Sequence, residues 1–166
     1  PTPTIYHRHT TNNNYRTHDT MASLSHSEIQ TLLAESAHDP ASCPQLEAYV
    51  RAQVSAVASA LAASELPDVR YCFDANRTLV KLYQCHPHLE GAAGRTLTAH
   101  AAFLALLRFP STDFLALMCL VPERVQAAEP CATLVRCAEL LEAGRFAAFW
   151  PEFRRLGIPE YGAGDG

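Results

Sequence analysis

The stretch CATLVRCAELLEAGRFAAFWPEF, residues 131–153, decides the fold class, because it contains two amphipathic helical patterns joined at Gly144. Before Gly144, apolar residues recur at three- and four-residue steps, which places them on one side of a helix. These residues are Leu134, Cys137, Ala138, Leu140 and Leu141. The same spacing resumes beyond the glycine at Phe146, Phe149, Trp150 and Phe153. Glycine readily adopts the positive φ found after many helices, so the stretch predicts a helical hairpin.

A hairpin with these apolar residues cannot cover both of its faces by itself. Neighbouring hairpins must stack on it, which is how helical repeat proteins build a core. We therefore predict an all-α fold of stacked antiparallel helical hairpins, of the HEAT or TPR kind, with about seven helices. A fold of this kind predicts a scaffold that contacts other macromolecules.

Five further helical patterns precede the hairpin. They are predicted to lie near residues 25–36, 43–61, 71–86, 95–109 and 112–121, with a turn around Pro67 between the second and the third. The fourth is expected to bury Leu97, Ala101, Leu104 and Leu107, and the fifth a stripe of Phe114, Leu117, Met118 and Val121. Ser25 with Glu28, and Ser42 with Gln45, match the capping box at a helix start. Gly91 and Gly94 are expected to loosen the connection into the fourth helix. A short segment between two prolines, residues 122–130, separates the fifth helix from the hairpin.

The chain divides by composition into three parts. Residues 1–20 are rich in Thr, Asn and His and nearly lack aliphatic side chains, so we predict a disordered N-terminal tail or extension over residues 1–24. Residues 25–158 are predicted to form the helical-repeat domain, and residues 159–166 a flexible C-terminal end. Met21 resembles a natural start, which leaves open whether residues 1–20 are native.

Composition favours a protein partner. The chain is 48% hydrophobic and 18% charged, which suits one folded domain, and its net charge of −4 gives no general attraction to nucleic acid. No direct sequence-specific binding of nucleic acid is expected. The six dispersed cysteines are interpreted as reduced thiols. No apolar run is long enough to span a bilayer, so we predict a cytoplasmic protein without a membrane partner.

Catalytic motifs are weak in this sequence. The candidate metal cluster Cys85-His86-Pro87-His88 is interpreted as the end of a helix, since neighbouring ligands cannot all converge on one tetrahedral ion. A cysteine paired with a histidine across the fold, for example with His100, stays open as an alternative. No phosphate-binding loop or nucleophile elbow is present. We therefore predict no enzymatic activity and no catalytic, cofactor-binding or metal residue.

Two groups of residues are candidates for partner contact. The first lies in the segment between the prolines and contains Glu123, Arg124 and Gln126, for which a solvated turn is the alternative. The second is Trp150 with Phe153 at the end of the hairpin. Large aromatic side chains dominate many interfaces, and Trp150 with Phe146 and Phe149 could form such an anchor. Their helical spacing matches an inward face, so we interpret these three residues as core.

Three segments in order carry a family resemblance. DANRTLVKLYQCHP (residues 74–87), LLRFPSTDFLALMCLVPERVQ (106–126) and LLEAGRFAAFWPEF (140–153) resemble subunit k of eukaryotic translation initiation factor three, most closely its plant and algal forms. The resemblance covers roughly residues 43–155. It implies a non-catalytic scaffold subunit with a helical-repeat part, acting in translation initiation without a cofactor.

The resemblance also implies partners. These are other subunits of initiation factor three, especially subunit l, and the small ribosomal subunit through the complex. The family continues into a winged-helix region, whereas this sequence becomes Gly-rich after Phe153, so most of that region is expected to be missing. The alternatives are an adaptor in a proteasome-lid or signalosome type of complex and, less favoured, a cysteine- or metal-dependent enzyme.

Overall fold

The computed structural model describes residues 24–63 and 71–157, and within these ranges it contains helices and no strand. The elements are α1 (His26–Ser36), the 3-10 turn η1 (Pro40–Ser42), α2 (Cys43–Ala62), α3 (Phe73–Cys85), α4 (Pro87–Leu106), α5 (Asp113–Met118), α6 (Glu123–Gln126), α7 (Cys131–Glu142) and α8 (Phe146–Arg154). The predicted all-α fold is confirmed. The predictions for residues 1–23 of the N-terminal tail, the turn at Pro67 and residues 159–166 lie outside the described residues. Leu24, the last residue of the predicted tail, packs against the core.

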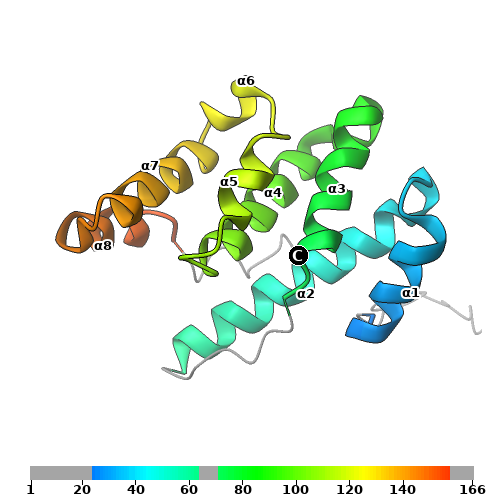
Figure 1. Ribbon diagram of the computed structural model, residues 1–166, viewed down its shortest axis with the longest axis horizontal. Coiled ribbons are helices and arrows are strands. Elements are labelled where there is room, and N and C mark those ends of the chain that lie inside the picture. The colour runs from blue at the N-terminus through cyan, green and yellow to red at the C-terminus, as the bar shows by residue number, and fades with distance from the viewer. Residues whose placement is uncertain (1–23, 64–70, 158–166) are drawn as a thin grey trace, which may run out of the picture.

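Helix α4 is the centre of the packing. It contacts α2, α3, α5 and α7, while α7 packs mainly against α8 (Figure 1). In the view of Figure 1, α1 lies at one end of the molecule and the α7–α8 hairpin at the other. The largest side chains with almost no exposure come from six helices: Ile29, Leu46, Leu79, Leu97, Phe103, Leu104, Leu117 and Leu134. These helices therefore share one hydrophobic core.

The two predicted capping boxes differ in outcome. At the start of α1, the Glu28 amide donates to Ser25 Oγ, and the Ser25 amide donates to Glu28 Oε2 at 2.7 Å, so this box is confirmed. The prediction for Ser42 and Gln45 is wrong. Ser42 has helical φ and ψ and its hydroxyl donates to the Asp39 carbonyl at 2.7 Å, so it is not available to cap α2.

Helix α4 is longer than predicted. It begins at Pro87, directly after the end of α3, and continues through both glycines that were expected to loosen this region. Proline suits the first turn of a helix because its missing N–H would have no helical partner there. A Cβ on Gly94 would lie 3.1 Å from Glu90 Cγ and 3.5 Å from the Tyr83 ring. The closer contact is with a side chain of α4 itself, and 3.5 Å from the Tyr83 ring of α3 is an ordinary van der Waals distance.

The predicted hairpin turn is confirmed. Gly144 has φ of 64° and follows α7. The Gly144 amide donates to the Leu141 carbonyl at 3.0 Å, and the Arg145 amide donates to the Leu140 carbonyl at 2.8 Å. This pair of hydrogen bonds is the Schellman motif, which satisfies the last carbonyls of a helix and reverses the chain. The single-turn helix α6 was not predicted as a helix.

Replacing the glycine of this turn tests its conformational role. Gly144→Ala is expected to lower the free energy of unfolding by about 1–2 kcal/mol, because a Cβ disfavours the left-handed region. No atom lies within 4 Å of the added Cβ, so contacts do not contribute to this loss. Urea denaturation followed by circular dichroism measures it. Gly144→Asn is the control, because asparagine tolerates this region better. Equal losses for both variants would contradict the explanation.

Candidate partner-contact surfaces

Helix α8 presents aromatic rings to solvent. Trp150 is 53% exposed and Phe146, one turn earlier, is 54% exposed, whereas Phe149 points inward and is buried. Phe153 is half-buried and stacks at 6.2 Å between ring centroids on Phe103 of α4. We call Phe146, Trp150 and Phe153 the aromatic surface of α8.

The rings of this surface support one another. The Phe149 centroid lies 5.1 Å from that of Trp150 in an edge-to-face arrangement and 5.1 Å from that of Phe153 in a stacked one. Trp150 and Phe153 also meet edge to face at 6.2 Å. Such pairs are favourable beyond the burial of area. Buried Phe149 therefore holds the exposed indole in a defined position.

The interpretation of Trp150 and Phe146 as core residues is wrong. Their spacing did match an inward helical face, but α8 is the last described helix and packs mainly against α7. Phe149 and Leu156 occupy the inward positions, and both are buried. The position of α8 at the edge of the stack is set by the long-range packing of the chain. Helical spacing alone does not report that position.

Polar contacts hold α8 on α7. Arg136 of α7 donates to Glu129 Oε1 at 2.9 Å and forms an ion pair with Glu152 of α8 at 3.4 Å. Thr133 donates its hydroxyl to Glu129 Oε2 at 2.7 Å, and this hydrogen bond together with Arg136 lowers the pKa of Glu129. Arg136 therefore joins α7 to α8 through Glu152, and to the segment before α7 through Glu129.

The segment between the prolines contributes to structure as well as to surface. The Gln126 side-chain amide donates to the carbonyls of Met118 at 3.0 Å and Val121 at 2.8 Å. Met118 is the last residue of α5, and its carbonyl also accepts a hydrogen bond from the Val121 amide at 3.1 Å. Gln126 therefore ties α6 to the end of α5 and to the turn that follows it. Glu123 is exposed at the start of α6. The sequence missed the structural role of Gln126.

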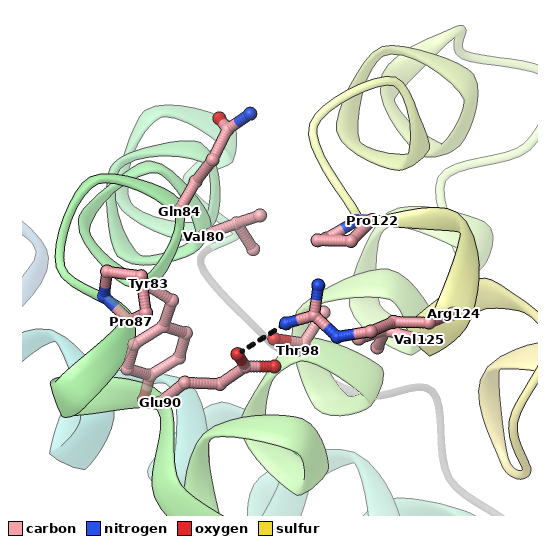
Figure 2. A pocket seen from close by; sticks show the side chains of 9 residues that line it. All are labelled: Val80, Tyr83, Gln84, Pro87, Glu90, Thr98, Pro122, Arg124 and Val125. Atoms are coloured by element: carbon pink, nitrogen blue, oxygen red, sulfur yellow. Dashed lines mark hydrogen bonds and ion pairs between the residues drawn. The ribbon is translucent and has the colours of Figure 1, made fainter.

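Arg124 lies beside a pocket between α3, α4 and the turn into α6. The Arg124 guanidinium forms an ion pair at 3.4 Å with Glu90 of α4, as Figure 2 shows. The pocket has a volume of about 250 Å³. Its lining residues are Val80, Tyr83, Gln84, Pro87, Glu90, Thr98, Pro122, Arg124 and Val125. Because these positions are far apart in sequence, the sequence did not predict the pocket.

A second exposed apolar group lies around the turn between α4 and α5. Leu107 is 39% exposed, so its predicted inward position is wrong, and Phe109 and Leu115 are 42% and 59% exposed. A hollow of about 90 Å³ adjoins Phe109 and Leu115 and reaches Glu142 at the end of α7. The predicted stripe of α5, which includes Phe114 and Leu117, is buried as expected. Leu115 falls outside that stripe, so the helical spacing of α5 is enough to place it at the surface.

The cysteines of this chain lie both inside the core and at the surface. All six cysteines are free thiols. Burial raises the pKa of Cys43, Cys131 and Cys137 to about 11, which opposes the thiolate that a nucleophile or metal ligand requires. Among the residues that the structure describes, no three His, Cys, Asp or Glu side chains form a metal-binding group. No helix in the same ranges is long and apolar enough to cross a membrane.

Sequence comparison identifies relatives of this chain. Over 123 residues, 74% of the chain, it is 32% identical to eukaryotic translation initiation factor 3 subunit K of Dictyostelium discoideum. The human subunit K is 30% identical over 113 residues, 68% of the chain. The chain is a relative of initiation factor 3 subunit K. The predicted family resemblance is therefore confirmed, while the specific likeness to plant and algal forms stays a prediction.

The matched region covers less than half the length of each subunit K protein. It covers 43% of the Dictyostelium protein, 45% of the human protein and 44% of the Drosophila erecta protein, which is 28% identical. The chain thus spans less than half the length of the subunit K proteins it matches. No protein-family model matches the chain.

Proposed function

We propose that the chain is a non-catalytic scaffold subunit of an initiation factor 3 assembly, and that it supports translation initiation in the cytoplasm through protein–protein contacts. The observation that carries this proposal is the sequence relation to subunit K proteins, which are named as subunits of that factor. The proposed partners are other subunits of the factor, especially subunit l, and the small ribosomal subunit through the complex.

The aromatic surface of α8 supports a role in protein contact. Tryptophan is enriched among the residues that dominate binding free energy at interfaces. The indole of Trp150 is exposed and braced by Phe149 and Phe153, so a partner would pay little to immobilise it. Glu123 and Arg124 are exposed at α6 and belong to a second proposed contact. We assign Trp150 and Phe153 to the main proposed contact.

The chemistry of the thiols supports a non-catalytic role. The three buried cysteines have raised pKa values, and burial lowers the pKa of His100 to about 4. A cysteine nucleophile activated by histidine needs the opposite arrangement, in which a thiolate is stabilised near neutral pH.

Affinity purification of the tagged chain from its own cells tests the proposal. Initiation factor 3 subunits and the small ribosomal subunit are expected to co-purify. Trp150→Ala is expected to reduce the apparent affinity for those subunits at least about 30-fold, the loss of a strong interface residue of about 2 kcal/mol. Quantitative mass spectrometry over a dilution series of the chain measures this loss.

The control for this experiment is Leu61→Ala, which removes an exposed large apolar side chain at the end of α2. It is expected to leave co-purification unchanged. Recovery of proteasome-lid or signalosome subunits instead of initiation factor 3 would overturn the proposed function. If Trp150→Ala recovers the initiation factor 3 subunits as fully as the native chain does, the proposed membership in the assembly stands. The proposed contact through the aromatic surface of α8 would then be wrong.

A further inference from the structure

The pocket beside Arg124 has the size of one side chain. Its volume of about 250 Å³ is below the range of about 300–1,000 Å³ in which most small-molecule sites fall. Val80 and Val125 line it and are themselves buried, and in Figure 2 the ring of Pro122 lies across the opening from Val80. An apolar side chain of a partner protein fits this lining and this volume.

The walls of this pocket are fixed before anything binds. The Tyr83 hydroxyl donates to Glu47 Oε1 of α2 at 2.6 Å, so the ring is held from behind. Tyr83 is only 4% exposed, so the surrounding core also holds the ring. On the opposite side, Gln126 fixes the turn that carries Pro122 by bonding the Met118 and Val121 carbonyls. Preorganised walls reduce the entropy that a partner side chain loses on binding.

The exposed charge beside the pocket favours a partner group of opposite charge. The Glu90 side chain is only 16% exposed and is covered by Arg124, whereas the Arg124 side chain is 71% exposed. A guanidinium has five N–H donors, and the contact with Glu90 uses one nitrogen at 3.4 Å. The charged group that a partner can reach is therefore the Arg124 guanidinium and not the Glu90 carboxylate. A carboxylate is the group that matches a guanidinium fork with two parallel hydrogen bonds.

We propose that this pocket docks a segment of a protein partner in which an aliphatic or aromatic side chain enters between Val80, Val125 and Pro122. A neighbouring Asp or Glu carboxylate pairs with Arg124. This inference rests on the proposed function as a scaffold subunit and gives the chemistry of one of its contacts. It also assigns Arg124, at one edge of the apolar pocket, a role distinct from that of the aromatic surface of α8.

Site-specific photo-crosslinking in the full chain tests this docking. A benzophenone amino acid replaces Gln84, which is exposed and lines the pocket, and the tagged chain is irradiated in its purified assembly. Mass spectrometry of the crosslinked peptide is expected to identify a partner segment with an apolar residue next to Asp or Glu. The same amino acid at exposed Ser59, on α2, is the control and is expected to give no such segment.

A second measurement uses a short fluorescein-labelled peptide centred on the crosslinked residue. Fluorescence anisotropy is expected to show about a tenfold loss of affinity for Arg124→Gln, and a similar loss when the peptide carboxylate becomes an amide. The two changes together are expected to cost little more than either one, since they remove the same interaction. Arg145→Gln, which removes an exposed arginine from the turn before α8, is expected to bind normally.

The outcomes separate this inference from the proposed function. If initiation factor subunits co-purify but Gln84 gives no crosslink, or crosslinks a segment without a carboxylate, the docking is overturned and the proposed function stands. Additive losses in the peptide experiment would also overturn the pairing with Arg124. If a segment of the expected chemistry comes from a protein outside initiation factor 3, the docking stands and the proposed function fails.

Discussion

Phe103→Ala is expected to lower the free energy of unfolding by about 3–5 kcal/mol, the range for removing a buried phenylalanine ring. Phe103 is 1% exposed on α4, the helix that contacts α2, α3, α5 and α7. Its ring also stacks on Phe153, so its loss opens a cavity beneath α8. Because domains are stable by only about 5–15 kcal/mol, the variant is expected to be partly unfolded under mild conditions.

The control for this prediction is Trp150→Ala. The indole is 53% exposed, so its removal is expected to cost less than about 1 kcal/mol. If the indole lay in the core, Trp150→Ala would lower the free energy of unfolding as much as Phe103→Ala does. Equilibrium urea denaturation followed by circular dichroism measures both variants. Equal losses would show that the indole is covered in the free chain and would contradict its place on the aromatic surface of α8.

The second large effect is a loss of stability in mild acid. His100 is buried on α4, and burial together with the charge of Arg51 lowers its pKa from 6.5 to about 4. The folded state therefore binds this proton less readily than the unfolded state does. Stability from this group is complete above pH 6.5 and is lost as the pH falls toward 4. Between pH 7 and pH 5 the loss from His100 is expected to be about 2 kcal/mol.

Comparison with His100→Gln isolates this effect, because other groups also titrate in acid. Urea denaturation at several pH values gives the free energy of unfolding of each protein. The difference between the two proteins is expected to change by about 2 kcal/mol from pH 7 to pH 5, with the native chain losing more. Parallel pH profiles would contradict a buried neutral His100.

Local features of the fold were readable from the sequence because they depend on neighbouring residues. The Ser25 capping box, the positive φ of Gly144 and the buried stripe of α5 all follow from short-range spacing. The capping box predicted for Ser42 failed because a 3-10 turn begins at Asp39, and the Ser42 hydroxyl bonds the Asp39 carbonyl instead. The prediction for Gly91 and Gly94 failed because a glycine inside a helical pattern can be tolerated without ending the helix.

The candidate surfaces depend on contacts between distant residues, and the sequence reported them only in part. The sequence singles out Trp150 and Phe153 as candidates for partner contact, but helical spacing does not separate an exposed ring from a buried one. Arg124 was also named, yet its pocket requires Val80 and Glu90, which reach it only through the packing of α3 and α4. Family resemblance does not supply this information, because it reports ancestry and not which face is covered.

The central position of α4 has a consequence for how the chain comes apart. In an elongated repeat array each unit touches only its neighbours, so end units can melt while the middle persists. Here α4 touches α2 and α3 on the N-terminal side and α5 and α7 on the C-terminal side. Opening either half exposes the same α4 residues, so residues 24–63 and 71–157 are expected to unfold cooperatively. Native-state hydrogen exchange would then show one shared opening free energy for the amides of α2, α4 and α7.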